Sequence, residues 1–452
     1  MQSDFPSDAH DDRSSTPFAG PKPAASALPM TPVQPGERLL SLDVLRGIAL
    51  FGILVVNIQL FAMPLMPAFM PPNFPELPLA DQLAFLTTRT FFEMKFISLF
   101  SLLFGAGLAI QAHRAGERNV AFGWLYARRL VILLAIGLIH ALVLWYGDIL
   151  VFYACFGFIL LAMHTVKPKT MAMIGVILLG VSVFMSLTCS GIQTLSMQYQ
   201  PEFPPLPADP PLGFAAMNEA QFQPQHPVWI HAETVAYQRG PLPDQFLFRG
   251  VTWMFSIMAM LQYGWRVLGM FMLGAALCRM GFFRPDARPL QKRLALLGLG
   301  AGLTLELVSL ALFVPYLTGT GPAWLSIIAQ PIHDAGASLL CLGLAGVICL
   351  LVYGRAAGLL KPFAPVGRVA LSVYIGQTLI ATTIMYSWGF GQFGTFSRAE
   401  LLGMAVAIYV SLAVLATLWL LLFRAGPLEW LWRTLTYLRP QPLLRRPKES
   451  IL

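Results

Sequence analysis

His140 and Asp148 are ionisable residues that flank a tight reversal, at Gly147, between two apolar segments of the sequence. His140 stands about two helical turns before this reversal, and Asp148 follows it directly. Near pH 7 an imidazole can exchange a proton, and a carboxylate can orient the ring and stabilise its charged form. Because the two residues lie on either side of a hairpin, they could approach, directly or through water. The pair could act as a carboxylate-assisted general base; the alternative, that His140 is purely structural, stays open.

The first long apolar segment contains three further polar residues, Asp43, Arg46 and Asn57. A charge inside a membrane-spanning helix costs ~2.5 kcal/mol or more unless it is partnered. Asp43 and Arg46 are three positions apart, so they share a helix face and can pair. Asn57 lies about 16 Å further along the helix than Arg46. Its amide could donate to a ligand carbonyl or a developing oxyanion, or could only join two helices.

Two other apolar segments carry polar residues that extend the candidate site. Lys95 opens one of them, where its ammonium group could instead extend to the membrane interface. The segment 367–378 is the most polar of the C-terminal half and contains Arg368, Tyr374 and Gln377. Arg368 could bind a phosphate in a bidentate geometry, or could only mark the cytoplasmic end of its helix.

The remaining histidines and cysteines indicate no metal site. All five cysteines lie in apolar segments, without CxxC or Cys/His ligand spacing. His333 and Asp334 are adjacent and form a second candidate proton pair, which we rank below the first. No Walker loop, zinc signature or GxSxG elbow occurs, so we expect no metal cofactor.

Composition places the chain among membrane proteins. Of its 452 residues, 56% are hydrophobic and only 12% are charged, against roughly 25% charged residues in soluble domains. The net charge of +8 could suggest nucleic acid as a partner. However, the cationic residues form short clusters between apolar runs, as membrane topology requires, so the expected partner is the lipid bilayer and not nucleic acid.

A helix needs ~20 mainly apolar residues to cross a bilayer. This length predicts an all-α, polytopic bundle of about ten transmembrane helices. The predicted spans are 42–63, 95–113, 128–146, 148–166, 170–192, 257–279, 294–317, 331–353, 367–388 and 400–423. We expect the apolar but charge-containing region 79–94 to lie along the interface before the second span.

Loop charges predict the orientation of these spans. Basic clusters follow the second, fourth, sixth and eighth spans and fill the C-terminal tail. The long loop 193–247 is acidic, and the loop 318–330 has no charge. The positive-inside rule then places both termini in the cytoplasm, in a bacterial inner membrane.

The same pattern divides the chain into five parts. Residues 1–36 lack an apolar core and read as a disordered cytoplasmic tail. Five helices follow in 37–192, and the proline-rich segment 193–247 is expected to be an extended or irregular external loop. A second membrane half covers 248–438, and 439–452 form a basic cytoplasmic tail.

Several motifs together resemble the YeiB family of bacterial inner-membrane proteins. They are Arg38-Leu-Leu-Ser-Leu-Asp43-Val-Leu-Arg46-Gly47, Ile53-Leu-Val-Val-Asn57, Lys95-Phe-Ile-Ser-Leu-Phe-Ser-Leu-Leu-Phe-Gly105, Gly147-Asp148-Ile-Leu, Gly367-Arg368-Val-Ala-Leu-Ser-Val-Tyr374-Ile-Gly-Gln377 and Gly426-Pro427-Leu-Glu429-Trp430-Leu-Trp-Arg433. The resemblance extends from about residue 38 to residue 438, and the C-terminal half looks like the family's domain of unknown function.

The N-terminal part is also similar to the transmembrane acyltransferase superfamily, through Asp43, Arg46 and Gly47 with Asn57 further along. This resemblance implies an acyl-CoA donor that enters from the cytoplasm and an acceptor on the other side. It also implies a catalytic histidine in the first external loop, but residues 64–94 contain no His. Either His140 takes that role, or the fold is kept and the chemistry has changed.

We therefore expect an acyltransferase-like membrane enzyme that acts on an envelope glycan or lipid. Its thioester donor would bind near Asp43, Arg46 and the polar C-terminal span, Asn57 would support the acyl carbonyl, and His140 would deprotonate an external hydroxyl or amine. Two alternatives stay open, a small-solute transporter that uses the same intramembrane charges and a non-catalytic membrane protein. Apolar faces of small residues would allow a homodimer.

Overall fold

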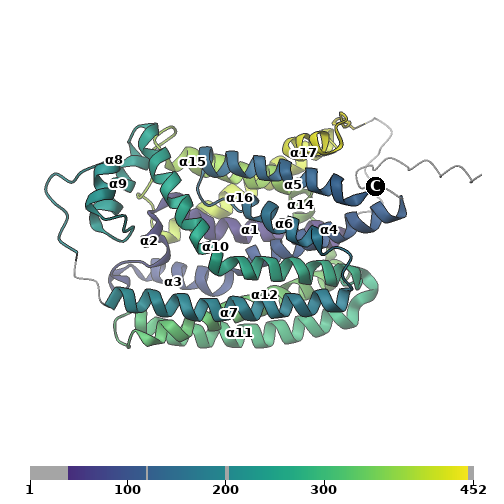
Figure 1. The fold of residues 1–452 in the computed structure, drawn as a ribbon, viewed down its shortest axis with the longest axis horizontal. Helices are drawn as coiled ribbons and strands as arrows, with labels where there is room; N and C mark the ends of the chain where they lie inside the picture. Colours follow the sequence, from purple (N-terminus) through teal and green to yellow (C-terminus); the bar gives the residue numbers. More distant parts are fainter. Residues whose placement is uncertain (1–38, 119–120, 199–202, 446–452) are drawn as a thin grey trace, which may run out of the picture.

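A computed structural model describes residues 39–118, 121–198 and 203–445. These residues form a bundle of helices that run mainly along the long axis of the molecule (Figure 1). Within these ranges the only β-type pairing is an isolated bridge between Phe423 and Leu444. The predicted all-α membrane bundle is confirmed. The expected tail 1–36 and residues 446–452 of the basic tail lie outside the described residues.

Each of the ten predicted spans coincides with a helix. The helices are α1 (Leu40–Ala62), α4 (Lys95–Glu117), α5 (Phe122–Ile139), α6 (Leu150–Ala162), α7 (Pro168–Gln198), α10 (Leu242–Arg279), α11 (Arg288–Leu317), α12 (Trp324–Val352), α15 (Ala370–Met385) and α16 (Arg398–Leu422). Seven helices of the described chain are long and apolar enough to cross a membrane. Helix α10 is not among these seven, and α6 and α15 are shorter, with 13 and 16 residues, so ten crossings remain a prediction.

Short elements connect these helices. They are α2 (Leu65–Phe69), η2 (Phe74–Glu76), α3 (Leu79–Thr87), the π-helical η3 (Thr88–Phe92) and η4 (His140–Leu144), α8 (Gly213–Glu219), α9 (Pro227–Gln238), η5 (Pro285–Ala287), α13 (Ala357–Leu360), α14 (Phe363–Arg368) and α17 (Pro427–Tyr437). The region 79–94 is thus a helix that leads into α4 through a left-handed residue, Met94, whose φ is 64°.

The expectation of an irregular loop at 193–247 is wrong in large part. Helices α8 and α9 form inside it, and α7 and α10 extend into it from either side. Proline does not prevent α9, because Pro227 occupies a first-turn position where no amide hydrogen is needed. The side chain of His226 caps the same helix by accepting from the Val228 N–H. Among the described residues of this loop, the prolines in non-helical chain are Pro204, Pro205, Pro207, Pro210, Pro211, Pro224 and Pro241.

Two close approaches between backbones fix the helices around the site. A Cβ on Gly105 of α4 would lie 2.0 Å from the carbonyl oxygen of Phe271 in α10. A Cβ on Gly367 of α14 would lie 1.8 Å from the carbonyl oxygen of Asp43 in α1. Only glycine permits these distances, so α1 packs directly on α14 and α4 on α10.

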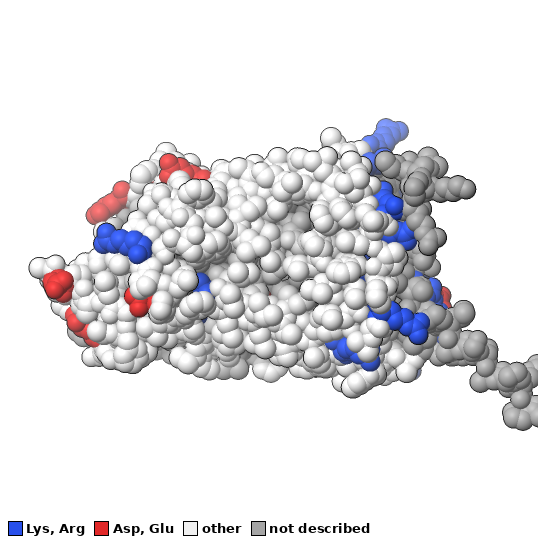
Figure 2. Space-filling view, turned by 90° about the horizontal axis from the view of Figure 1, so that it is seen from above, with Lys and Arg blue, Asp and Glu red and all other residues white. Residues whose placement is uncertain are grey.

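Charged residues are distributed unequally along the long axis. Figure 2 shows Lys and Arg at the end near the C-terminus and most Asp and Glu at the opposite end, near α8 and α9. The positive-inside rule requires such an asymmetry. That the basic end faces the cytoplasm remains a prediction.

Candidate functional site

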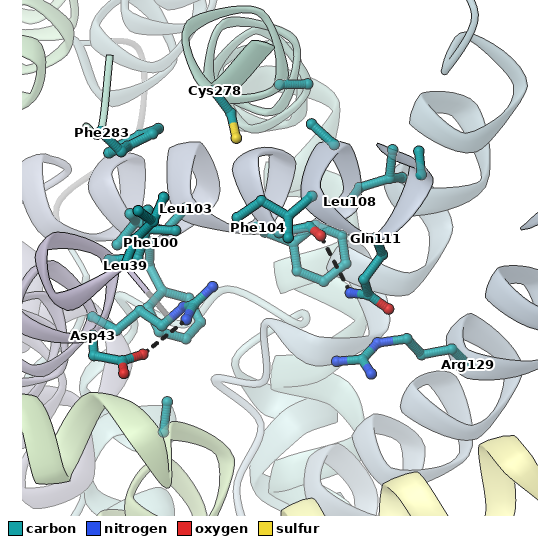
Figure 3. Close-up of a pocket in the computed structure, with 18 of the residues that line it drawn as sticks. Leu39, Asp43, Phe100, Leu103, Phe104, Leu108, Gln111, Arg129, Cys278 and Phe283 are labelled. Carbon is teal, nitrogen blue, oxygen red and sulfur yellow. Dashed lines mark hydrogen bonds and ion pairs between the residues drawn. The ribbon is translucent and has the colours of Figure 1, made fainter. Parts of the chain in front are cut away.

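A cavity of about 1220 Å³ opens near the basic end of the bundle (Figure 3). Its walls come from α1, α4, α5, α6, α7, α10, α14, α15 and α17 and from the connection between α10 and α11. Seven arginines line it, namely Arg46, Arg114, Arg129, Arg279, Arg284, Arg368 and Arg433. Four acidic residues accompany them, namely Asp43, Glu117, Asp286 and Glu429. The mouth therefore carries an excess of positive charge.

Further along the same helices the lining becomes apolar and aromatic. On α1 the lining passes from Asp43 to Ile53, and on α5 from Arg129 to Leu133. The far end is lined by Phe100, Phe104, Ile149, Leu150, Tyr153 and Tyr374. The cavity thus joins a polar, cationic mouth to an apolar inner end.

The predicted pairing of Asp43 with Arg46 is confirmed. Arg46 donates to Asp43 Oδ1 over 3.4 Å, and both side chains line the cavity. The pair is partly solvated, with 13% of the Asp43 side chain and 28% of the Arg46 side chain exposed. Arg368 lines the same cavity, so the structure brings these three predicted donor-binding residues together.

His140 and Asp148 also meet as predicted. Their Nδ1 and Oδ1 atoms are 2.8 Å apart, and both side chains are buried. The second oxygen, Oδ2, accepts from the Val151 N–H at 2.7 Å, so α6 holds the carboxylate by its first turn. An ionised Asp148 in this position binds the Nδ1–H tautomer of His140.

The other ring nitrogen, His140 Nε2, lies 2.9 Å from the hydroxyl oxygen of Thr378 in α15. With Nδ1 protonated towards Asp148, Nε2 is an acceptor and the Thr378 hydroxyl donates to it. The sequence prediction did not include Thr378, although it directly follows Gln377 in the polar C-terminal segment. Only tertiary contact identifies it, because 238 positions separate it from His140.

His140 lies close to the cavity but is not among the residues that line it. The ring centroid of Tyr374, which does line it, is 5.1 Å from that of His140. Ile149 and Leu150, the residues after Asp148, line the same inner end. The pair His140 and Asp148 is therefore one side chain away from the apolar end of the cavity.

The segment that carries His140 is the π-helix η4, a form that is rare and often found at functional sites. Arg249 of α10 is buried and donates hydrogen bonds to the carbonyl oxygens of Leu142 and Val143. These contacts fix the end of η4 and with it the position of the imidazole.

Asn57 is not among the residues that line the cavity. Its half-buried side chain makes no hydrogen bond within the described part of the chain. Its predicted role at the acyl carbonyl stays a prediction. Gln377 is buried and donates to the Leu50 carbonyl over 3.1 Å, so it joins α15 to α1.

Lys95 lies elsewhere, in a group that we call the buried charge network: Lys95, Arg266, Glu306, His333 and Asp334. The Lys95 ammonium is 2.8 Å from Glu306 Oε1, and Glu306 Oε2 is 2.9 Å from His333 Nδ1. Asp334 pairs with Arg266 and accepts from Ser182. Lys95 is completely buried and does not extend to the interface, and His333 pairs with Glu306 and not with its neighbour Asp334.

Two carboxyls outside the membrane-spanning helices have altered pKa values. Burial raises the pKa of Glu429, whose Oε1 accepts from the Leu371 and Ser372 N–H groups at the start of α15. Burial also raises the pKa of Glu233 in α9 to about 8. Neither belongs to a metal site, since the described residues contain no group of three potential metal ligands.

Comparison with known proteins places this architecture in a family. The profile described as protein of unknown function (DUF418) matches residues 277–439. YxaH of Bacillus subtilis (strain 168) is 30% identical over 435 residues, which cover 93% of this chain and 99% of that protein. YeiB of Escherichia coli (strain K12) is 30% identical over 422 residues, covering 91% and 99%. The chain therefore belongs to the YeiB-like family of helical membrane proteins.

Proposed function

We propose that this protein is a multipass inner-membrane acyltransferase that moves an acyl group from a thioester donor, such as acyl-CoA, to a hydroxyl or amine of an envelope glycan or lipid. One observation carries the proposal. A cavity with an arginine-rich mouth and an apolar inner end comes within one side chain, Tyr374, of a buried histidine that is oriented by a carboxylate.

The two ends of the cavity suit the two ends of such a donor. Arginines bind phosphate groups through paired N–H donors, and seven arginines against four acids favour a polyanionic ligand. Apolar and aromatic side chains at the inner end suit an acyl chain. The resemblance to transmembrane acyltransferases suggests a donor of the same class, bound from the cytoplasm.

His140 supplies the proton chemistry in this proposal. Its Nε2 accepts a proton, and Asp148 holds Nδ1–H and stabilises the imidazolium that forms. Tyr374, in contact with both the cavity and the ring, would orient the reacting group.

The test is turnover of labelled acetyl-CoA by the purified protein in lipid nanodiscs, with an envelope glycan or lipid fraction added as the acceptor. We expect His140→Ala to lower the consumption of acetyl-CoA by about 10²–10⁴-fold, the usual contribution of a general base. His231→Ala, on the external helix α9, is the matched control and should leave turnover unchanged. Equal turnover in wild type and His140→Ala would refute the assignment, and failure to bind acetyl-CoA would refute the donor class.

The buried charge network favours transport of a small solute as a second candidate, because ionisable groups inside a bilayer often mark substrate or proton pathways. Flux of a solute into proteoliposomes without any covalent change would support it. Acyl transfer by the same preparation, without flux, would exclude it as the main activity.

A further inference from the structure

Both nitrogens of the His140 ring are engaged. Asp148 takes the Nδ1 hydrogen, and the Thr378 hydroxyl occupies Nε2 at 2.9 Å. The proton that His140 can accept without rearrangement therefore belongs to Thr378 and not to an incoming acceptor. We propose that Thr378 is a nucleophile, and that the acyl group is carried as an ester on its oxygen between donor and acceptor. This inference rests on the proposed acyl transfer.

The other threonines of α15 show that the contact of Thr378 with His140 is unusual. A threonine hydroxyl inside a helix commonly donates to the carbonyl four residues earlier. Thr382 and Thr383 do so, at 2.8 Å and 2.6 Å. For Thr378 the corresponding distance to the Tyr374 carbonyl is 3.5 Å, at the limit of a hydrogen bond. The hydroxyl of Thr378 is thus directed to the imidazole, in the arrangement that activates a nucleophile.

Thr378 is buried and does not itself line the cavity, but its position along α15 lies close to the inner end. It lies one turn beyond Tyr374, which lines the inner end of the cavity. The chain beyond α15 is covered by α9, because the Ser387 N–H donates to the Tyr237 carbonyl and the Tyr386 and Tyr237 rings are 4.5 Å apart. Thr378 therefore stands between the donor cavity and the end of the bundle from which an external acceptor would come.

The reaction balances in two steps. The Thr378 oxygen attacks the thioester carbonyl carbon and its proton passes to His140 Nε2; the carbon–sulfur bond then breaks and the thiolate takes that proton. An acceptor hydroxyl or amine next attacks the threonyl ester and gives a proton to His140. When the carbon–oxygen bond of the ester breaks, the Thr378 oxygen recovers the proton. Donor and acceptor never need to occupy the site together, so the bundle need not open at both ends at once.

The experiment uses full-length protein and radiolabelled acetyl-CoA without acceptor, quenched with acid during the first turnover. We expect release of free coenzyme A in amounts close to that of the protein, a mass increase of one acetyl group, and its location on Thr378 by tandem mass spectrometry. Thr378→Val should abolish the adduct, whereas Thr378→Ser should retain it. Thr382→Val, equally buried on the same helix, is the matched control and should also retain it.

The outcomes separate this inference from the proposed function. Acetyl-CoA turnover by Thr378→Val at the wild-type rate, or an acetyl group on His140 or elsewhere, would overturn the role of Thr378 and leave acyl transfer standing. A wild-type protein that neither binds nor consumes acetyl-CoA would overturn the function itself. The wild-type adduct decides the matter even if Thr378→Val fails to fold.

Discussion

Two histidines of this bundle contact a carboxylate in nearly the same way, but their surroundings differ. His140 is 2.8 Å from Asp148, and His333 is 2.9 Å from Glu306, with all four side chains buried. His140 continues to a neutral hydroxyl and adjoins the cavity. His333 belongs to a network closed by ion pairs, and none of its members lines the cavity. Contact between a histidine and a carboxylate is therefore not sufficient evidence of catalysis. The distinguishing features are access to the cavity and the identity of the third group that contacts the histidine or its carboxylate.

The charges of the buried charge network balance. Lys95 and Arg266 carry positive charge opposite Glu306 and Asp334, and both ion pairs lie inside the bundle. An isolated charge in this environment is far more expensive than a pair. These contacts join α4, α10, α11 and α12, so we assign the network to folding unless solute flux is observed.

The largest expected effect is a loss of acetyl-CoA turnover in the Asp148→Asn variant. Asp148→Asn keeps an oxygen for the Val151 N–H but removes the charge that orients His140. We expect acetyl-CoA turnover to fall by about 10²–10⁴-fold, with little change in the yield of folded protein. Radiolabelled turnover and size-exclusion profiles measure the two quantities. Normal turnover would show that Asp148 is a structural carboxylate like Glu306, so that the two histidine–carboxylate pairs would not differ in function.

For Lys95→Met we expect the opposite pattern, a large loss of stability and not a direct loss of chemistry. Removing the ammonium leaves Glu306 without its charged partner, which destabilises the protein by about 3–5 kcal/mol. The thermal midpoint in nanodiscs should drop strongly, and the double variant Lys95→Met/Glu306→Gln should recover much of it. A stable Lys95→Met protein that has lost turnover would contradict the structural assignment.

A comparable effect on stability should follow from pH, through Glu233 in the α8–α9 region. Its folded-state pKa of about 8 exceeds the ordinary 4.5, so between these values the folded chain holds a proton that the unfolded chain has lost. The free energy of unfolding should therefore fall as pH rises from about 4.5 to about 8, at up to ~1.4 kcal/mol per pH unit, and be constant above.

Thermal unfolding at pH 5 and pH 9 measures this effect. Glu233→Gln should remove much of the pH dependence and should stabilise the protein at pH 9 relative to wild type. Glu219→Gln, on α8 of the same 203–241 segment, is the control and should leave the pH dependence as in wild type. An unchanged profile in Glu233→Gln would show that other groups determine the pH response.

The smallest effect on stability is expected at the mouth of the cavity. Asp43 and Arg46 are partly solvated, and such pairs contribute only ~0–1 kcal/mol. Asp43→Asn should therefore leave the thermal midpoint nearly unchanged. If the mouth binds a polyanion, loss of this negative charge should tighten acetyl-CoA binding, measured by titration calorimetry, whereas Arg46→Gln should weaken it. The same affinity in both variants would remove the pair from the donor site.

Short-range features were predictable from the sequence. Apolar runs of about twenty residues located the long helices, a spacing of three residues paired Asp43 with Arg46, and one tight reversal brought Asp148 to His140. Each of these inferences depends only on local geometry. The YeiB-like resemblance likewise depended on motifs that are visible in the sequence alone.

Long-range partners were not predictable. Thr378 and Glu306 face their partners because of how distant helices rotate and pack, which no spacing within one helix reveals. The two helices α8 and α9 were missed because prolines were counted as breakers, although a proline at a first turn is compatible with a helix.

The glycine contacts between helices restrict how the cavity can change shape. With Gly367 against the Asp43 carbonyl, and Gly105 against that of Phe271, no side chain separates these backbones and no rotamer can adjust their spacing. The spacing between α1 and α14, and that between α4 and α10, should therefore stay fixed. Any change in the width of the entrance should then come from α5 and α17, which are in contact through the stacking of Arg129 on Trp432. We therefore expect a crosslink between those two helices to slow the entry of a bulky ligand into the cavity.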